Sequence, residues 1–145
     1  MQYKLITDEL SLKTPCEPVS LDEGMEIAYL LFDILNRTKG GVGLAANQIG
    51  INKRVCVVNV VEPLCFINPV ICSVGGSVTF NEGCLSFPNR SVITQRHRII
   101  GVRADNFEGD LKMYTCAKNE LECVCVQHEI DHLNGITMFD REVRR

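Results

Sequence analysis

The stretch "QHEIDHLNG", residues 127–135, contains two of the three histidines of the chain. His128 and His132 are four positions apart, so they project from one face of a helix about one 5.4 Å turn apart. Two imidazoles in this arrangement can bind one metal ion, and Glu129, rotated about 100° around the axis, can lie over the open side of that ion without binding it. This H-E-x-x-H pattern is typical of metal hydrolases, in which the acid transfers a proton.

A polar helix face that binds no metal is the alternative interpretation of the histidine pair. Leu121, Val124 and Cys125 precede His128 at helical spacing, and we expect all of them to be buried. Histidines that face a core need a partner, because an unpaired buried polar group is costly. The surrounding sequence therefore favours a metal as that partner.

A catalytic metal site normally has three protein ligands and one open position. Cys84, in "NEGCLSFP", is our candidate for the third ligand, because glycine and polar residues surround it rather than valines. In an HExxH zinc metallopeptidase, by contrast, the third ligand would follow the helix, and the candidates there are Asp140 and Glu142.

The composition is that of an ordinary globular chain, and we expect one domain over residues 1–145. The net charge of −3 offers no basic surface for nucleic acid or for an anionic membrane, and no apolar run approaches the roughly 20 residues of a membrane span. The start of the chain has no apolar signal segment. We therefore expect a cytoplasmic protein whose eight cysteines are free thiols rather than disulfides, and the lack of a CxxC pair argues against a zinc finger.

Two predicted helices flank a middle of short, mostly antiparallel strands, an order that predicts an α+β fold. Ser20 and Glu23 form a capping signature for a helix over residues 20–41, and a second helix should run from an Asn119 cap to a stop at residues 134–135. We expect mostly antiparallel strands over residues 54–61, 64–71 with a break at Pro69, and 75–83, and a hairpin over residues 97–116 that turns near residues 108–110.

With these residues in view, the chain resembles the peptide deformylases. Three motifs of that family are present in the same order and at similar spacing: "GVGLAANQ" (41–48), "EGCLS" (82–86) and "QHEIDH" (127–132). The resemblance covers nearly the whole chain. It implies the deformylase fold around a central metal-binding helix, and a metal-dependent hydrolase that removes the formyl group from the N-terminal formyl-methionine of nascent polypeptides and releases formate.

The resemblance also implies roles for individual residues. The implied metal ligands are Cys84, His128 and His132. The ion would be one divalent metal, Fe²⁺ in the cell, which Zn²⁺, Ni²⁺ or Co²⁺ can replace. Glu129 would be the general base and acid. The side chain of Gln48 and the backbone N–H of Leu85 would donate hydrogen bonds to the formyl oxygen.

The methionine side chain of the substrate would enter an apolar pocket. By the family pattern its walls are Val42, Phe80, Leu121, Val124 and Cys125. The peptide would pair like an added strand with the backbone near Gly43, where glycine permits close approach, and it would also lie against Glu82 and Gly83.

Further residues are expected to act indirectly. Glu82 and Asp131 are candidates for groups that orient the metal ligands, Arg96 is a candidate partner for one of them, and Gln127 could be structural. Asn89 stands near the place where family members often carry glycine, so the peptide contacts after Pro88 stay open, with Arg90 as a candidate for one of them.

Many bacterial members continue beyond the metal helix with a further helix, whereas this chain stops at residue 145. We expect activity without that helix, and docking on the ribosome is doubtful. The expected partners are formylmethionyl peptides, with no nucleic acid or membrane, and the expected state is a monomer. The alternative functions are an HExxH zinc metallopeptidase and a non-catalytic metal-binding or redox-sensing relative, although a mere metal holder has no use for Glu129.

Overall fold

The computed structural model describes residues 3–107, 113–116 and 119–143. Its α-helices are α1 (Leu21–Arg37) and α2 (Glu120–Leu133). Short 3-10 helices are η1 (Leu10–Leu12), η2 (Ala46–Ile49) and η3 (Met138–Arg141). The strands are β1 (Gly43–Ala45), β2 (Val55–Asn59), β3 (Pro63–Ile67), β4 (Val70–Gly75), β5 (Val78–Cys84), β6 (Phe87–Arg96), β7 (Ile99–Arg103) and β8 (Tyr114–Thr115).

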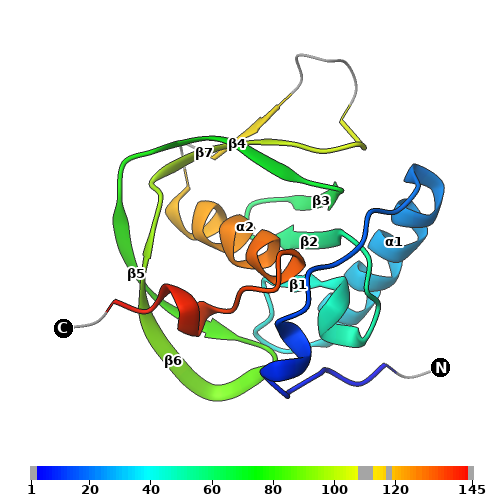
Figure 1. Cartoon of the computed structure of the whole chain (residues 1–145), viewed down its shortest axis with the longest axis horizontal. Helices are drawn as coiled ribbons and strands as arrows, with labels where there is room; N and C mark the ends of the chain where they lie inside the picture. The colour runs from blue at the N-terminus through cyan, green and yellow to red at the C-terminus, as the bar shows by residue number, and fades with distance from the viewer. Residues whose placement is uncertain (1–2, 108–112, 117–118, 144–145) are drawn as a thin grey trace.

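The strands form three antiparallel groups around α2. Their orders are β1-β2-β3, β4-β7-β8 and β5-β6. In Figure 1, α2 crosses the middle of the molecule, with β1–β3 and α1 on one side and the long β5–β6 pair on the other. The predicted α+β fold of mostly antiparallel strands around a central helix is therefore confirmed.

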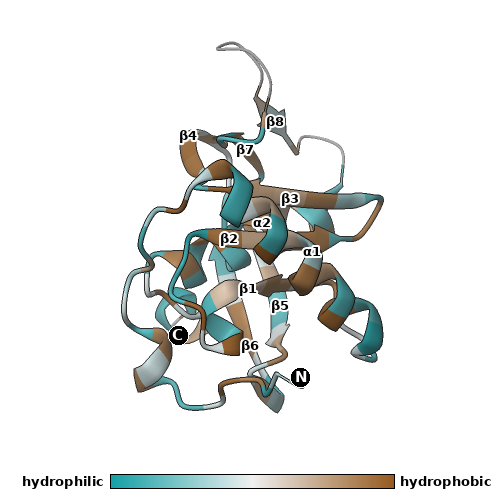
Figure 2. Ribbon diagram, turned by 90° about the vertical axis from the view of Figure 1, so that its right-hand side faces the viewer, coloured by the Kyte–Doolittle hydropathy of each residue, from teal (hydrophilic) through white to brown (hydrophobic). Residues whose placement is uncertain are grey.

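Helix α1 begins where the sequence predicts, because the Ser20 hydroxyl accepts the backbone N–H of Glu23 at 3.2 Å. Its apolar stripe is buried against β2 and β3 through Ile27, Ala28, Leu31 and Leu35. The strands β2 and β3 are largely brown in Figure 2, whereas α1 alternates between brown and teal, as expected for a helix with one buried face. The helix ends at Arg37, slightly before the predicted glycine stop.

Helix α2 is buried along nearly its whole length. Asn119 caps it by accepting the N–H of Glu122 at 2.9 Å, as predicted, and every residue from Glu122 to Leu133 is buried. Leu121, however, is 41% exposed, so the prediction that it is buried is wrong. It lies in the first turn of the helix.

The strand predictions are confirmed in outline, but they omit β1 and β6. β3 and β4 are separated at Pro69, and β7 pairs with β8 as the predicted hairpin requires; the turn predicted near residues 108–110 lies outside the described residues. β6, the longer of the two, has 10 residues and pairs with β5. Most of its side chains are exposed, so it lacks the apolar alternation that marks a half-buried strand.

The structure joins Cys116 and Cys123 in a disulfide, with their Cα atoms 5.1 Å apart. The prediction of free thiols throughout is therefore wrong for this pair. The end of β8 and the first turn of α2 bring the two residues together although they are seven positions apart, a proximity that composition cannot reveal. The remaining cysteines are free, as predicted.

No helix in the described ranges combines the length and the apolar composition that a membrane crossing requires.

The Ser20 cap generates a stability prediction. Ser20→Ala removes the acceptor of the Glu23 N–H, and replacing a serine cap typically lowers the free energy of unfolding by about 1 kcal/mol. Ser20→Asp keeps an acceptor and should remain close to the wild type. Urea titration of the purified protein followed by circular dichroism measures both. Equal loss in the two variants would contradict this account of the start of the helix.

Candidate metal centre

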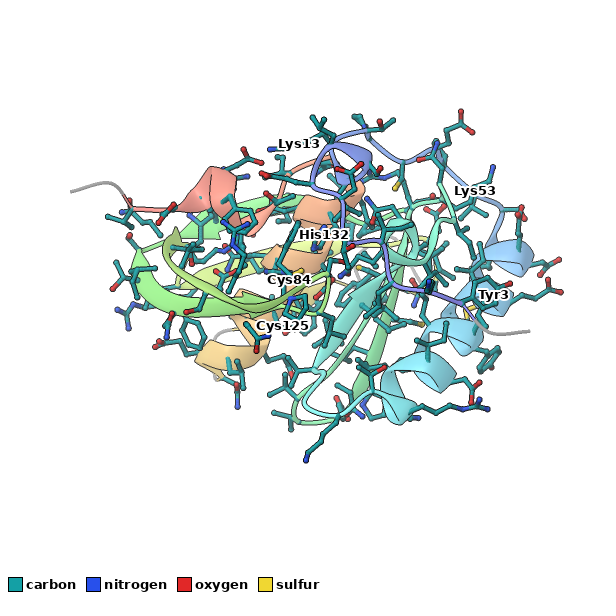
Figure 3. All side chains as sticks on the ribbon, turned by 90° about the horizontal axis from the view of Figure 1, so that it is seen from below. Tyr3, Lys13, Lys53, Cys84, Cys125 and His132 are labelled. Atoms are coloured by element: carbon teal, nitrogen blue, oxygen red, sulfur yellow. A yellow bond between two sulfur atoms is a disulfide. The ribbon has the colours of Figure 1, made fainter. Side chains whose placement is uncertain are left out.

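The end of β5 and one face of α2 bring three metal-binding side chains together. Cys84, His128 and His132 each offer one ligand atom, and these atoms all lie within 4.8 Å of one another. Nε2 of His132 lies 3.4 Å from Cys84 Sγ and 3.2 Å from His128 Nε2. Figure 3 shows Cys84 and His132 beside each other in the interior.

These separations fit a single tetrahedral ion. A zinc ion with a Zn–S distance of about 2.3 Å and Zn–N distances of about 2.0–2.1 Å holds its ligand atoms roughly 3.3–3.6 Å apart. The set of one thiolate and two imidazoles also suits zinc and the other divalent transition metals. The residues present therefore fit the metal that the H-E-x-x-H pattern predicts.

Glu82 holds His128 in the orientation that metal binding needs. Its Oε1 lies 2.8 Å from His128 Nδ1, so the ring donates there and turns the lone pair of Nε2 toward the other ligand atoms. Burial alone would raise the pKa of Glu82, but hydrogen bonds from Arg96 and His128 outweigh it and lower that pKa to about 2. Glu82 is therefore ionised at neutral pH.

Arg96 contacts both carboxylates that were expected to orient the ligands. It binds Glu82 in two places, Nε to Oε2 at 2.6 Å and Nη2 to Oε1 at 2.8 Å. Its third nitrogen, Nη1, donates to Asp131 Oδ2 at 2.5 Å. The Thr94 hydroxyl donates to Glu82 as well. Sequence reasoning did not anticipate Thr94, which comes from the unpredicted strand β6.

Glu129 is the buried carboxylate that lacks a full set of partners. Its side chain is buried, and Oε1 has no hydrogen-bond partner among the described residues. Burial raises the pKa of Glu129 to about 7. A carboxyl group in this condition can take up and return a proton near neutral pH.

Gly43 allows the carboxylate of Glu129 to lie where it does. A Cβ atom at this position would be 2.6 Å from Glu129 Oε2 and 2.8 Å from Cys125 Sγ. Atoms cannot approach so closely, so any side chain at this position would displace one or both groups. Close approach is thus the reason for a glycine here.

Gln48 presents its amide N–H₂ group to the metal ligands. Its Oε1 accepts the Ala45 N–H at 2.9 Å, which directs Nε2 toward Ser86 Oγ at 3.1 Å and Cys84 Sγ at 3.6 Å. Leu85 follows Cys84 directly, in the turn between β5 and β6. The buried Ser86 partner was missed, although it stands in the "EGCLS" motif.

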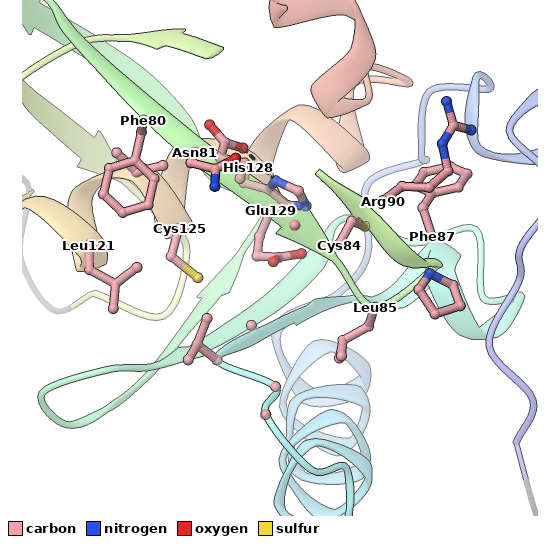
Figure 4. Close-up of a pocket in the computed structure, with 18 of the residues that line it drawn as sticks. Phe80, Asn81, Cys84, Leu85, Phe87, Arg90, Leu121, Cys125, His128 and Glu129 are labelled. Atoms are coloured by element: carbon pink, nitrogen blue, oxygen red, sulfur yellow. Dashed lines mark hydrogen bonds and ion pairs between the residues drawn. The ribbon is translucent and has the colours of Figure 1, made fainter. Parts of the chain in front are cut away.

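A cavity of about 340 Å³ adjoins these groups, and all the predicted pocket walls line it. Val124 and Cys125 are buried, whereas Val42 and Leu121 are partly exposed at its mouth. In Figure 4, Phe80, Leu121 and Cys125 lie on one side of Glu129, and Cys84, Leu85 and Phe87 on the other. Gly43, Glu82 and Gly83 also line the cavity. Lining residues that sequence reasoning did not name include Asn81 and Phe87.

Other candidate residues lie elsewhere or are already engaged. Asp140 accepts the Lys13 ammonium at 2.5–2.6 Å and the Thr137 N–H at 2.9 Å, and it is not in the group of possible metal ligands among the described residues, nor is Glu142. The ligand set of the metallopeptidase alternative is therefore not assembled.

Gln127 and Arg90, two polar candidates from the sequence, contact groups away from the metal-ligand atoms. Gln127 exchanges hydrogen bonds with the backbone of His97 at 2.9–3.0 Å and so ties α2 to the end of β6, a structural contact. The guanidinium of Arg90 lies over the ring of Phe139, 4.2 Å from its centroid, at the edge of the cavity.

Comparison with known proteins agrees with this geometry. The family model described as "Polypeptide deformylase" matches residues 4–145. A peptide deformylase of Hydrogenovibrio crunogenus is 38% identical over 94% of this chain and 82% of its own length, and that of Neisseria gonorrhoeae is 37% identical over 90% and 80%.

Solved structures agree as well. The peptide deformylase of Thermotoga maritima superposes with a TM-score of 0.87 at 29% identity, over 99% of both chains. A probable peptide deformylase of Synechococcus phage S-SSM7 superposes with a TM-score of 0.82 at 34% identity, over 97% of this chain and 99% of the other. The chain therefore belongs to the polypeptide deformylase family.

Proposed function

We propose that this chain hydrolyses the formamide bond of N-terminal formyl-methionine on nascent polypeptides and releases formate. Membership of the family supports the reaction. The observation that carries the proposal is the juxtaposition of Glu129, the three ligand atoms and an apolar cavity of about 340 Å³. This arrangement provides proton transfer, a metal site and a place for a methionine side chain.

Cys84, His128 and His132 are the proposed metal ligands, with Glu82 holding His128. A divalent ion bound there would act as a Lewis acid and make water nucleophilic at neutral pH. We propose Fe²⁺ as the ion in the cell on the basis of the family resemblance, with zinc, nickel or cobalt able to replace it, because thiolate and imidazole ligands bind all of these divalent metals.

Glu129 is the proposed general base and acid. It accepts a proton from the water that attacks the formyl carbon and then delivers a proton to the amine nitrogen as the C–N bond breaks. The products are formate and a free amino terminus. Among the described residues Oε1 has no hydrogen-bond partner, which supports this role, since a proton carrier needs an oxygen that no other group occupies.

Gln48 and Leu85 are the proposed donors to the formyl oxygen as negative charge develops on it. The side-chain amide of Gln48 is oriented by its bond to Ala45, and the Leu85 N–H follows Cys84 in the chain. A preorganised donor of this kind typically contributes about 2.7–4 kcal/mol to lowering the barrier.

The edge of β1 is the proposed binding site for the peptide backbone. β1 pairs with β2 on one side and is the edge strand of its sheet, and Val42 and Gly43 line the cavity. An extended peptide can add to such an edge as another strand, between β1 and Gly83 of β5. Its first side chain would then enter the cavity between Phe80, Val124 and Cys125.

A direct assay separates this function from its alternatives. Metal-loaded protein should release formate from formyl-Met-Ala-Ser and leave Met-Ala-Ser intact. Cleavage of a peptide bond in Met-Ala-Ser would instead support the metallopeptidase, and bound metal with no formate release would support a non-catalytic binder. The cytoplasmic location, the monomeric state and any contact with the ribosome stay predictions.

The proposed ligand set predicts the effect of removing the sulfur. Cys84→Ala should lower the metal content from about one ion per chain to near zero, because two imidazoles alone hold an ion weakly. Cys72→Ala, which removes an exposed free thiol, is the control and should retain full metal content. Elemental analysis of protein purified without oxygen measures both. Full metal content in the Cys84 variant would support a ligand set without sulfur.

The proposed base predicts a loss of rate without a loss of metal. Glu129→Gln keeps the shape of the side chain but cannot carry the proton, and general acid–base catalysis typically contributes about 10²–10⁴-fold to the rate. We expect kcat to fall by about that factor while the metal content is unchanged. Glu120→Gln, at the exposed start of the same helix, should behave like the wild type. An active Glu129 variant would remove the proposed base.

The close approach at Gly43 predicts a positional effect. Gly43→Ala should displace the carboxylate of Glu129, and a misplacement of about 1 Å can cost 10²-fold in rate. Gly75→Ala is the control, because its added Cβ meets no atom within 4 Å. Steady-state formate release compares the two. Unchanged kcat in Gly43→Ala would show that the position of the carboxylate does not depend on this glycine.

A further inference from the structure

A continuous chain of ion pairs links the C-terminal segment to the metal ligand His128. It begins at Arg141 in η3, passes through Asp131, Arg96 and Glu82, and ends at His128 Nδ1. We propose that Arg141 is a positioning residue of the metal centre, which acts through this chain. The inference rests on the proposed metal site and concerns a residue that touches neither the ligands nor the cavity beside them.

The inner half of this chain leaves Glu82 little freedom. Both of its carboxylate oxygens are bound by Arg96, and Oε1 also accepts from His128. The side chains of Glu82 and Arg96 are 4% and 3% exposed, so each depends on protein partners for most of its hydrogen bonds. The orientation of the His128 ring is therefore tied to the position of the Arg96 guanidinium.

The outer half fixes Arg96 from the other side. Asp131 Oδ2 accepts from Arg96 at 2.5 Å and from Arg141 Nε at 3.0 Å, while Oδ1 accepts from Arg141 Nη2 at 3.0 Å. Two carboxylates and two guanidinium groups thus balance in charge. Without Arg141, one buried oxygen of Asp131 loses its partner, and Asp131 then bonds to Arg96 alone. Arg96 is therefore drawn toward Asp131 and away from Glu82.

Arg141 lies at the accessible end of the chain of ion pairs. Its side chain is 43% exposed, whereas that of Asp131 is 8% exposed. A second cavity, of about 150 Å³, is lined by Arg96, Asp131 and Arg141. The segment that carries Arg141 is attached to β6 by the bond from Val143 N to Ile93 O at 2.8 Å. Replacing Arg141 therefore changes the charge balance while the fold around it is still held by other contacts.

Metal affinity is the readout that separates positioning from stability. We would measure zinc affinity by competition with a chelator, and the visible spectrum of the cobalt-loaded protein, for Arg141→Gln, Arg141→Lys and Arg54→Gln. Arg54 is the matched control, because it also ties α2 to the rest of the protein, through Leu133 O at 3.1 Å and Pro69 O at 2.9 Å, but it bonds to no member of the chain of ion pairs.

Loss of a direct partner of a metal ligand typically costs 10–100-fold in metal affinity, so for the more distant Arg141→Gln we expect about a 3–10-fold loss and a shifted cobalt spectrum. Arg141→Lys, which keeps the positive charge, should have a metal affinity and a cobalt spectrum closer to those of the wild type. Arg54→Gln should lower thermal stability and leave affinity and spectrum unchanged. Wild-type affinity and spectrum in Arg141→Gln, or equal shifts in the Arg54 control, would overturn the inference. A wild-type protein that binds no metal would instead remove the proposed function.

Discussion

The burial of α2 on all sides is the constraint on which the rest of the structure depends. A buried helix must provide a partner for each polar side chain it carries, because an unpaired polar group costs about 1–3 kcal/mol. Its buried polar residues are Glu122, Gln127, His128, Glu129, Asp131 and His132. Most of them bond to groups on other elements, and within the described part of the chain the fully buried atoms of α2 side chains that have no partner are Glu129 Oε1 and His132 Nδ1. The unpaired carboxylate oxygen belongs to the residue proposed to carry the proton.

The strand groups on the two sides of α2 contribute different parts of the structure. β1–β3 and α1 supply a large apolar core on one side, and β5–β6 supply the sulfur of Cys84 and the carboxylate of Glu82 on the other. The cavity opens between them, lined by residues of β1 and of β5. The residues proposed for binding and catalysis thus lie where the two strand groups meet, with α2 as the element common to both.

Much of this could be predicted from the sequence because the signals are local. The caps of both helices depend on residues three positions apart, and the histidine pair on residues four positions apart. Cys84 was selected because its polar and glycine neighbours differ from those of the core cysteines, and the structure brings it beside the two rings. The resemblance to the deformylase family then indicated that the three motifs form one site, which no local pattern could indicate.

The remainder depends on tertiary contacts that leave little trace in the sequence. Strand β6 was missed because its side chains are mostly exposed. Asn89 within it has a φ of 65°, a left-handed conformation that asparagine tolerates better than most residues and glycine adopts freely, which explains how it can stand near a position where the family often uses glycine. The disulfide and the link between Arg141 and Asp131 join residues whose proximity appears only in the folded chain.

X-ray absorption spectroscopy of the zinc-loaded protein tests the central claim most directly, because it reports the atoms that surround the ion. A single ion held by Cys84, His128 and His132 predicts one sulfur at about 2.3 Å and two imidazole nitrogens at about 2.0–2.1 Å, with a solvent oxygen in the remaining position. A shell of nitrogen and oxygen without sulfur, or a fourth ligand from the protein, would contradict the account.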